Sequence, residues 1–319
     1  PEQVQIVDFS ASLDRSQFGG GLTLLLRDKP AFGLSATIDR LDLDSYRASA
    51  EALGTGDDAP EASVPAGFVD PFPYLDLFDA NLQLEVGELT YNRRLFKRLS
   101  VDATVSNGSL IARRIVFGDA AGLNGSVSGT FAGPLARVAV DSRIDLTTRN
   151  IGETLDAVGL RTPPALDGAG AMRLFGTVKT EDGEVMPNLT LEALGGRLSV
   201  EGSVMPSLPS PDLALSVSLD HSQGRRLLAL VGVDDPDLPV ERVRLQGTVA
   251  SADEGYDVDT TVQALDATAS FKGIISPARG ETAVAGALLV NHPEFREFVA
   301  MLAPGYAPRS EQLGPWRLA

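Results

Sequence analysis

The chain has 319 residues, a formal net charge of −16 at pH 7, 43% hydrophobic residues and no cysteine. Nucleic-acid binding depends on clustered Lys and Arg, so this charge argues against a nucleic-acid partner. The absence of cysteine excludes disulfides and thiolate metal sites. The longest apolar run, 227–233, is far shorter than the roughly 18 residues that span a bilayer.

Residues 1–54 are predicted to form the end of a first β-repeat and a helix. The run 19–21 is three glycines without the Lys-Ser/Thr ending of a phosphate-binding loop, and it favours a hairpin turn. Asp39, Asp42 and Asp44 cluster without the spacing of a calcium loop, which favours solvated residues near a helix boundary. Residues 55–74 are predicted to be a linker or insertion, because the stretch 55–66 contains Pro, Gly, Ser and acidic residues without an apolar period.

The second predicted repeat, 75–160, alternates between apolar and polar residues. The alternation is clear over 78–86 and 99–105, and is typical of strands with one apolar and one polar face. Asn107-Gly108 lies between two such strands and predicts a hairpin. Antiparallel pairing is therefore expected.

Short helical patterns recur along the chain and end on Gly159, Gly232 and Gly305, which are 73 residues apart in both cases. The predicted helices cover 153–158, 225–231 and 293–302. Further matches recur at an offset of 71 residues, so the unit is about 71–73 residues long. The remaining predicted divisions are a third repeat at 161–232, a fourth at 233–306, and a truncated further repeat at 307–319.

These patterns predict a mainly β protein with about 16 to 18 strands. The expected fold is a repetitive antiparallel sheet, curled into an elongated groove, with one short helix per repeat. A helix of about ten residues is roughly 15 Å long and covers about three strands, so much of the apolar surface needs another partner. That partner is either a second layer in a closed sandwich or an apolar ligand in an open trough.

If the trough is open, its lining consists of apolar residues at alternate strand positions. The candidates for lipid binding are Leu82, Leu84, Val86, Val101, Val105, Val200, Leu215, Val217, Leu245 and Val258.

No pattern in the sequence predicts catalysis, a metal or a cofactor. His221 lies beside Asp220 and Ser222, but members of a catalytic triad are rarely adjacent in sequence, so capping or exposure is the favoured role. His292 occupies the equivalent place in the next repeat, which favours a structural role there too. Acidic residues at 234, 235 and 237 also lack calcium-loop spacing. The chain is not expected to be an enzyme.

The sequence from Phe78 to Tyr91, the alternating segment 99–105, the turn at Asn107-Gly108 and the glycine-flanked strand 122–129 together resemble the carboxy-terminal region of the AsmA-like family. These are envelope proteins of Gram-negative bacteria. The stretch 195–202 repeats the glycine-flanked element. The resemblance is strongest over 78–131 and involves structural positions only.

The resemblance implies a periplasmic protein with a β-rich repeat body, held in the inner membrane through segments outside this sequence. Larger members look like bridges that carry phospholipid between membranes, so phospholipid and unidentified envelope proteins are the expected partners. The chain starts at Pro1 and is expected to be an internal piece of a longer protein. The alternative function is a closed β-repeat structural, adhesive or scaffold protein of the envelope.

Overall fold

The structure is a computed structural model that describes residues 2–13, 16–45, 72–91, 94–120, 122–133, 139–157, 170–205, 211–230, 241–253, 255–277, 282–294 and 316–318. The chain divides into two compact units. Unit 1 comprises Pro1–Arg161 and Thr177–Gly183, and unit 2 comprises Thr162–Gly176 and Glu184–Ala319.

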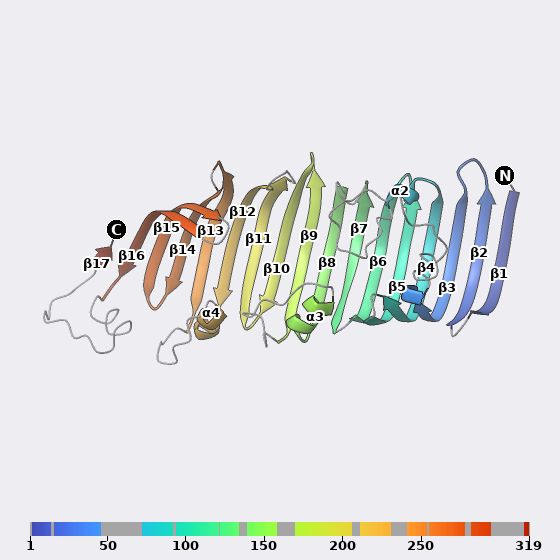
Figure 1. Cartoon of the computed structure of the whole chain (residues 1–319), viewed down its shortest axis with the longest axis horizontal. Helices are drawn as coiled ribbons and strands as arrows, with labels where there is room; N and C mark the ends of the chain where they lie inside the picture. The colour runs from blue at the N-terminus through green and yellow to red at the C-terminus, as the bar shows by residue number, and fades with distance from the viewer. Residues whose placement is uncertain are drawn as a thin grey trace. The chain divides into compact units, whose positions relative to one another are not determined.

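Unit 1 contains eight whole strands (Figure 1). They are β1 (Glu2–Leu13), β2 (Ser16–Leu26), β3 (Ala31–Asp42), β4 (Asp79–Tyr91), β5 (Arg94–Ser106), β6 (Ser109–Ala120), β7 (Leu123–Ala132) and β8 (Ala139–Thr148). Its wholly described helices are α2 (Phe72–Leu75) and α3 (Ile151–Ala157). Strand β9 (Met172–Glu181) is divided, with its last five residues in unit 1 and the rest in unit 2.

Unit 2 continues with strands joined mostly by short turns. They are β10 (Glu184–Ala193), β11 (Gly196–Met205), β12 (Asp212–His221), β13 (Val243–Ala252), β14 (Gly255–Ala264), β15 (Ala267–Pro277), β16 (Thr282–His292) and β17 (Trp316–Leu318). Helix α4 (Gly224–Leu230) follows β12. The 17 described strands agree with the predicted number, and the mainly β class is confirmed.

Within each unit, strands that follow one another in sequence are neighbours in the sheet. The described pairings are antiparallel in both units, except that β3 and β4 are parallel. This pair is the exception to the predicted antiparallel order. A short turn can only reverse the chain, whereas the 36 residues of 43–78 are long enough to return it to the other end of β3.

The expectation of one short helix per repeat is not supported. Helices α3 and α4 match the first two predicted helices to within two residues at their starts. The predicted helix 293–302 lies largely outside the described residues, and α2 lies elsewhere, at the end of the predicted linker. Helices of four to seven residues have little intrinsic stability, so a repeating sequence pattern alone does not produce them. The predicted repeat boundaries stay predictions.

Of the two hairpin turns predicted from the sequence, one is present and the other is not. Asn107 and Gly108 join β5 to β6 with φ values of 51° and 72°, as a two-residue hairpin of this sequence requires. The predicted hairpin at 19–21 is wrong, because these glycines lie inside β2. Gly20 pairs there with Ala36 of β3.

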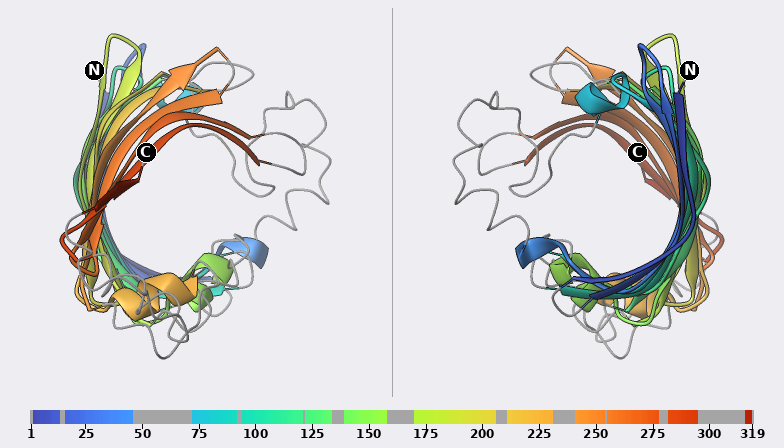
Figure 2. Two further views of the ribbon diagram at one scale, coloured as in Figure 1. Left: turned by 90° about the vertical axis from the view of Figure 1, so that its left-hand side faces the viewer. Right: turned by 90° about the vertical axis from the view of Figure 1, so that its right-hand side faces the viewer.

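The strands of each unit bend, and Figure 2 shows them as arcs. Glycine within a strand allows such a bend because it tolerates backbone conformations that side chains prevent. Gly202 of β11 has a φ of +141°, and a Cβ atom placed on it would lie 2.1 Å from the carbonyl oxygen of Ala214. The final glycine of the sequence motif 195–202 therefore marks close backbone approach to the next strand.

Buried residues in the described part of the chain include alanines and a few larger side chains, such as Ile38, Leu75 and Ile151. The fully buried side chains, below 2% exposure, include no large residue. The one described cluster of buried apolar residues joins Leu75 of α2 to Ala80 and Val105, with Phe32 and Phe78 packed against it. The rings of these two phenylalanines are 5.2 Å apart between centroids. Helix α2 thus covers the end of the sheet where β4 begins.

A candidate apolar binding face

Strand register places the five predicted lining residues of unit 1 on one face of its sheet. Residues directly opposite each other in neighbouring strands share a face. Leu84 of β4 is opposite Val101 of β5. Alternate residues on either side of this pair lie on the same face. The pairs are Ala80–Val105, Leu82–Ala103, Leu84–Val101 and Val86–Leu99. We call this side the apolar face of unit 1.

The apolar face of unit 1 extends over strands that the predicted lining omitted. In β3, Leu34 is opposite Leu82, and in β2, Leu22 is opposite Leu34. On the other side, Ile115 of β6 is opposite Val101, and Val127 of β7 is opposite Ile115. The same alternation of apolar and polar residues would have identified these positions in the sequence.

The five predicted residues of unit 2 also share one face. Val217 of β12 is opposite Val200 of β11 and Gly247 of β13. The other pairs of opposite residues on this face are Gly202–Leu215, Leu215–Val249, Leu219–Leu245, Leu245–Val262 and Val249–Val258. We call this side the apolar face of unit 2. It continues through Phe271 of β15, opposite Thr260 and Leu288.

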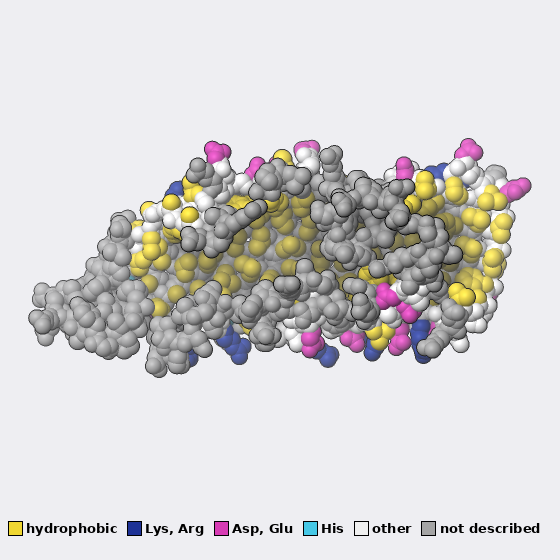
Figure 3. Space-filling model, viewed as in Figure 1, with side chains coloured by type: hydrophobic (Ala, Val, Ile, Leu, Met, Phe, Trp, Pro, Cys, Tyr) yellow, Lys and Arg dark blue, Asp and Glu magenta, His cyan; other side chains and the backbone are white. Residues whose placement is uncertain are grey.

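Most side chains on the two apolar faces keep contact with solvent. Among the ten predicted lining residues, Val86, Val105 and Val258 are buried and the other seven are of intermediate exposure. Leu288 of β16 is 52% exposed. Figure 3 shows hydrophobic side chains on the inner side of the strands in both units. These faces are therefore not saturated by packing within the described part of the chain.

The opposite, polar face of each sheet is stabilised by ion pairs between neighbouring strands. Arg113 of β6 binds Asp102 and donates a hydrogen bond to Thr104 at 2.5 Å. The Arg113 hydrogen bond lowers the pKa of the Asp102 carboxyl. In unit 2, Arg242 pairs with Asp220 at 2.5 Å and lowers its pKa in the same way. Asp102 and Asp220 are therefore each bound by an arginine side chain.

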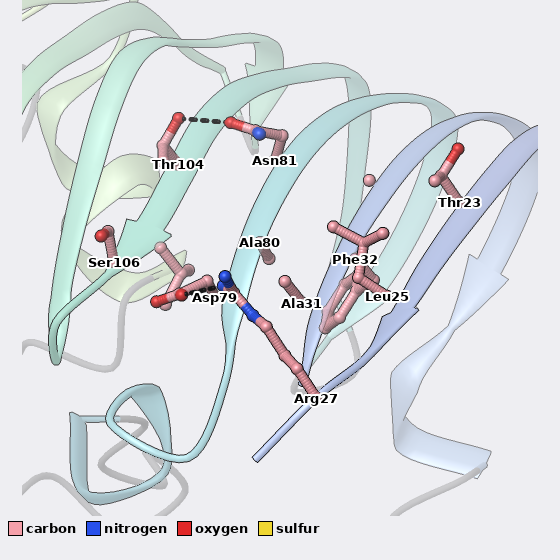
Figure 4. A pocket seen from close by; sticks show the side chains of 12 residues that line it. Thr23, Leu25, Arg27, Ala31, Phe32, Asp79, Ala80, Asn81, Thr104 and Ser106 are labelled. Atoms are coloured by element: carbon pink, nitrogen blue, oxygen red, sulfur yellow. Dashed lines mark hydrogen bonds and ion pairs between the residues drawn. The ribbon is translucent and has the colours of Figure 1, made fainter. Parts of the chain in front are cut away.

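Two hollows lie mainly on the polar face of unit 1. The larger hollow has a volume of about 490 Å³ (Figure 4). Four of its lining residues, Thr23, Gly33, Asn81 and Thr104, lie opposite one another on the neighbouring strands β2, β3, β4 and β5. A Cβ atom on Gly33 would meet no atom within 4 Å, so its missing side chain leaves the space open. The smaller hollow, about 370 Å³, shares Thr23, Gly33 and Asn81 with it. Of the predicted lining residues, only Val105 borders either hollow.

The last residue of four strands caps the turn that follows it. In each case the side chain accepts a hydrogen bond from the backbone N–H two residues later. The four acceptors are Asp42, Thr148, His221 and His292, at 3.1, 3.1, 3.1 and 2.9 Å. The last three are buried and stand 73 and 71 residues apart. The predicted structural role of His221 as a capping residue agrees with this geometry.

The His221 ring that caps the turn is also buried, with 2% of its surface exposed. Its Nδ1 atom accepts from the N–H of Gln223, while Nε2 has no hydrogen-bond partner among the described residues. Burial lowers the pKa of His221, with a smaller contribution from the charge of Arg226. The neutral ring is therefore the form that the fold stabilises.

This cap gives a testable stability difference. We expect His221→Thr to be more stable than the similarly shaped His221→Val by about 1 kcal/mol, because only Thr retains an acceptor for Gln223, as Thr148 does in the preceding repeat. Urea unfolding of both variants measures the difference. Equal stability would mean that the capping bond contributes nothing.

The pH dependence follows from the lowered pKa. Because the unfolded His221 titrates near 6.5 and the folded one lower, its contribution is fully present above pH 6.5 and is lost as pH falls towards the folded pKa. The wild type should therefore lose more stability than His221→Thr between pH 7.5 and pH 5. Parallel curves for the two proteins would contradict the assignment.

The described residues contain no group of three or more His, Cys, Asp or Glu side chains placed to hold a metal ion. Asp39 accepts hydrogen bonds from the N–H groups of Gln17 and Arg40, and Asp42 caps its turn. The acidic residues at 234, 235 and 237 lie outside the described part. None of the helices in the described ranges has the length and apolarity needed to cross a bilayer.

Comparison with known proteins gives no identification. No family profile, curated protein or solved structure matches the chain. The class of molecule is therefore defined by its own architecture, a repetitive β-sheet protein with an unsaturated apolar face in each unit.

Proposed function

We propose that this chain is a non-enzymatic segment that holds the acyl chains of phospholipids against its apolar faces. The observation that carries the proposal is the half-buried state of large aliphatic side chains along continuous register rows in each unit. A closed sandwich would bury such side chains fully. The resemblance to AsmA-like proteins supports a setting in the periplasm of a Gram-negative bacterium, with inner-membrane anchoring, in outer-membrane biogenesis or lipid transport between membranes.

The physical driving force is apolar contact. Burial of one methylene group contributes about 0.8 kcal/mol, so twelve methylenes covered on one side contribute about 5 kcal/mol. This contribution is non-directional, because it scales with area and not with the orientation of polar groups. The apolar faces should therefore accept acyl chains of different lengths with little selectivity.

Native mass spectrometry of the chain, purified from a bacterial envelope in mild detergent, tests this proposal. We expect several phospholipids per chain, identified after extraction, whereas a closed β-sandwich protein purified in parallel should carry none. A folded, lipid-free chain that also fails to bind an apolar dye would contradict the proposal. That result would favour the closed structural or scaffold alternative.

A further inference from the structure

Strand β16 of unit 2 is paired along the whole of one side and along only part of the other (Figure 1). On the first side it pairs with β15 without interruption. On the second side, β17 pairs only with Val290, Asn291 and His292. Residues 282–289 have no partner there among the described strands, and we call them the open edge of β16. Backbone groups along an open edge of this kind can pair with a further strand.

The open edge lacks the features that normally keep an edge strand from pairing. Natural edge strands carry charged residues, proline or bulges. Strand β16 contains no Asp, Glu, Lys, Arg or Pro, and among the described strands of unit 2 it alone has no charged residue. Its pairing with β15 has no bulge. In unit 1, by contrast, the edge strand β1 contains Glu2 and Asp8, and its pairing with β2 shifts between Ile6 and Phe9.

The side chains of the open edge are apolar on both faces of the sheet. Val284 and Leu288 lie on the apolar face of unit 2 and are 61% and 52% exposed. Ala285, Ala287 and Leu289 lie on the opposite face. An added strand would remove part of this apolar surface from water, which stabilises the pairing in addition to its hydrogen bonds.

The preceding repeat shows which kind of element covers this edge. His221 and His292 are the equivalent buried caps at the ends of β12 and β16. Strand β13 begins opposite His221 and stays paired with β12 as far as Ala214. Strand β17 begins opposite His292 in the same antiparallel register, but its described pairing stops at Val290. A strand that continues this ladder would therefore cover the open edge as β13 covers β12.

We infer that the open edge of β16 binds an extended strand of a partner protein, antiparallel to β16 and directly after Leu318 in the ladder. In such strand addition, main-chain hydrogen bonds provide affinity and alternate side chains provide specificity. The partner strand therefore presents apolar residues beside Val284 and Leu288. It is neutral or basic, because a chain of net charge −16 repels an acidic partner, including a second copy of itself.

The probe for this site is a fluorescent peptide with the sequence 245–252 of β13, the strand that covers the equivalent edge of β12. The peptide carries no charged residue. In the edge variant Val284→Lys/Leu288→Lys, the open edge receives the residue that protects natural edges. The matched control, Ala214→Lys/Ser216→Lys, adds the same charges at exposed positions of β12, which is paired on both sides. Fluorescence anisotropy measures peptide binding to each full chain.

We expect the wild type and the β12 variant to bind the peptide equally, and the edge variant to bind it about ten-fold more weakly. Hydrogen exchange should show that the bound peptide protects amides of the open edge. A peptide of the same sequence with every backbone nitrogen methylated keeps its side chains but loses its donors, so it should not bind.

Three results would overturn the inference. The first is that the wild type does not bind the peptide. The second is that the methylated peptide binds, or that the edge variant binds as well as the wild type, because the contact would then not be strand pairing at β16. The third is that the wild type alone self-associates in sedimentation and the edge variant does not, because the occupant would then be a second copy of the chain.

Discussion

Replacing Gly20 with Ala should lower the free energy of unfolding of unit 1 by about 3 kcal/mol or more. Gly20 lies in β2 with a φ of +152°, a conformation that is strained for any residue with a side chain. A Cβ atom there would also lie 1.9 Å from the carbonyl oxygen of Ser35. The backbone of β3 must move before an alanine can be accommodated.

Gly33→Ala is the matched control, because Gly33 lies in the neighbouring strand, two residues before Ser35. The space that an alanine methyl group would fill is open there and the backbone has no positive φ, so we expect a change of at most about 1 kcal/mol. Urea unfolding gives the overall effect, and hydrogen exchange of β2 and β3 amides locates it. Equal effects of the two substitutions would show that Gly20 is not needed for the bend.

Two aspartates on the apolar face should remove lipid retention. In the double variant Val101→Asp/Val127→Asp, the new carboxylates lie on β5 and β7, in register with Ile115 between them. Desolvation of a carboxylate by an acyl chain costs several kcal/mol, comparable with the apolar contact that the chain gains. We expect at least a ten-fold loss of bound phospholipid by native mass spectrometry.

The matched control adds the same charges to the polar face, as Thr104→Asp/Ser128→Asp. Ser128 is opposite Arg143, and Thr104 already accepts a hydrogen bond from Arg113, so both new carboxylates meet arginine. This variant should retain lipid at the wild-type level. A folded apolar-face variant with undiminished lipid would place the lipid elsewhere and refute the proposed binding face.

That the five candidate residues of each unit share one face of their sheet could be predicted, because strand alternation fixes it. A strand with one apolar side has only one register that keeps that side together, and local hairpin signals such as Asn107-Gly108 set where strands reverse. The parallel pairing of β3 with β4 could not be predicted this way, since it depends on the path of the chain between Asp42 and Asp79.

One other feature was missed, and another was predicted only in part. A run of glycines, as at 19–21, is compatible with both a turn and a bend inside a strand, and only the neighbouring backbone decides between them. The strand-end caps use Asp, Thr and His for one task, so no shared residue type reveals them. The offset of 73 residues between Thr148 and His221 was the available signal.

The parallel pair also has a consequence for the order of folding. Most described neighbours in unit 1 are joined by short turns, but pairing of β3 with β4 must close a loop of 36 residues. Relative to a four-residue loop this adds about 2 kcal/mol of chain entropy to the barrier. We therefore expect β1–β3 and β4–β8 to form separately, with docking of β3 onto β4 as the slow step. Pulse-labelling hydrogen exchange should show that the amides that pair β3 with β4 are protected later than those of the other strand pairs.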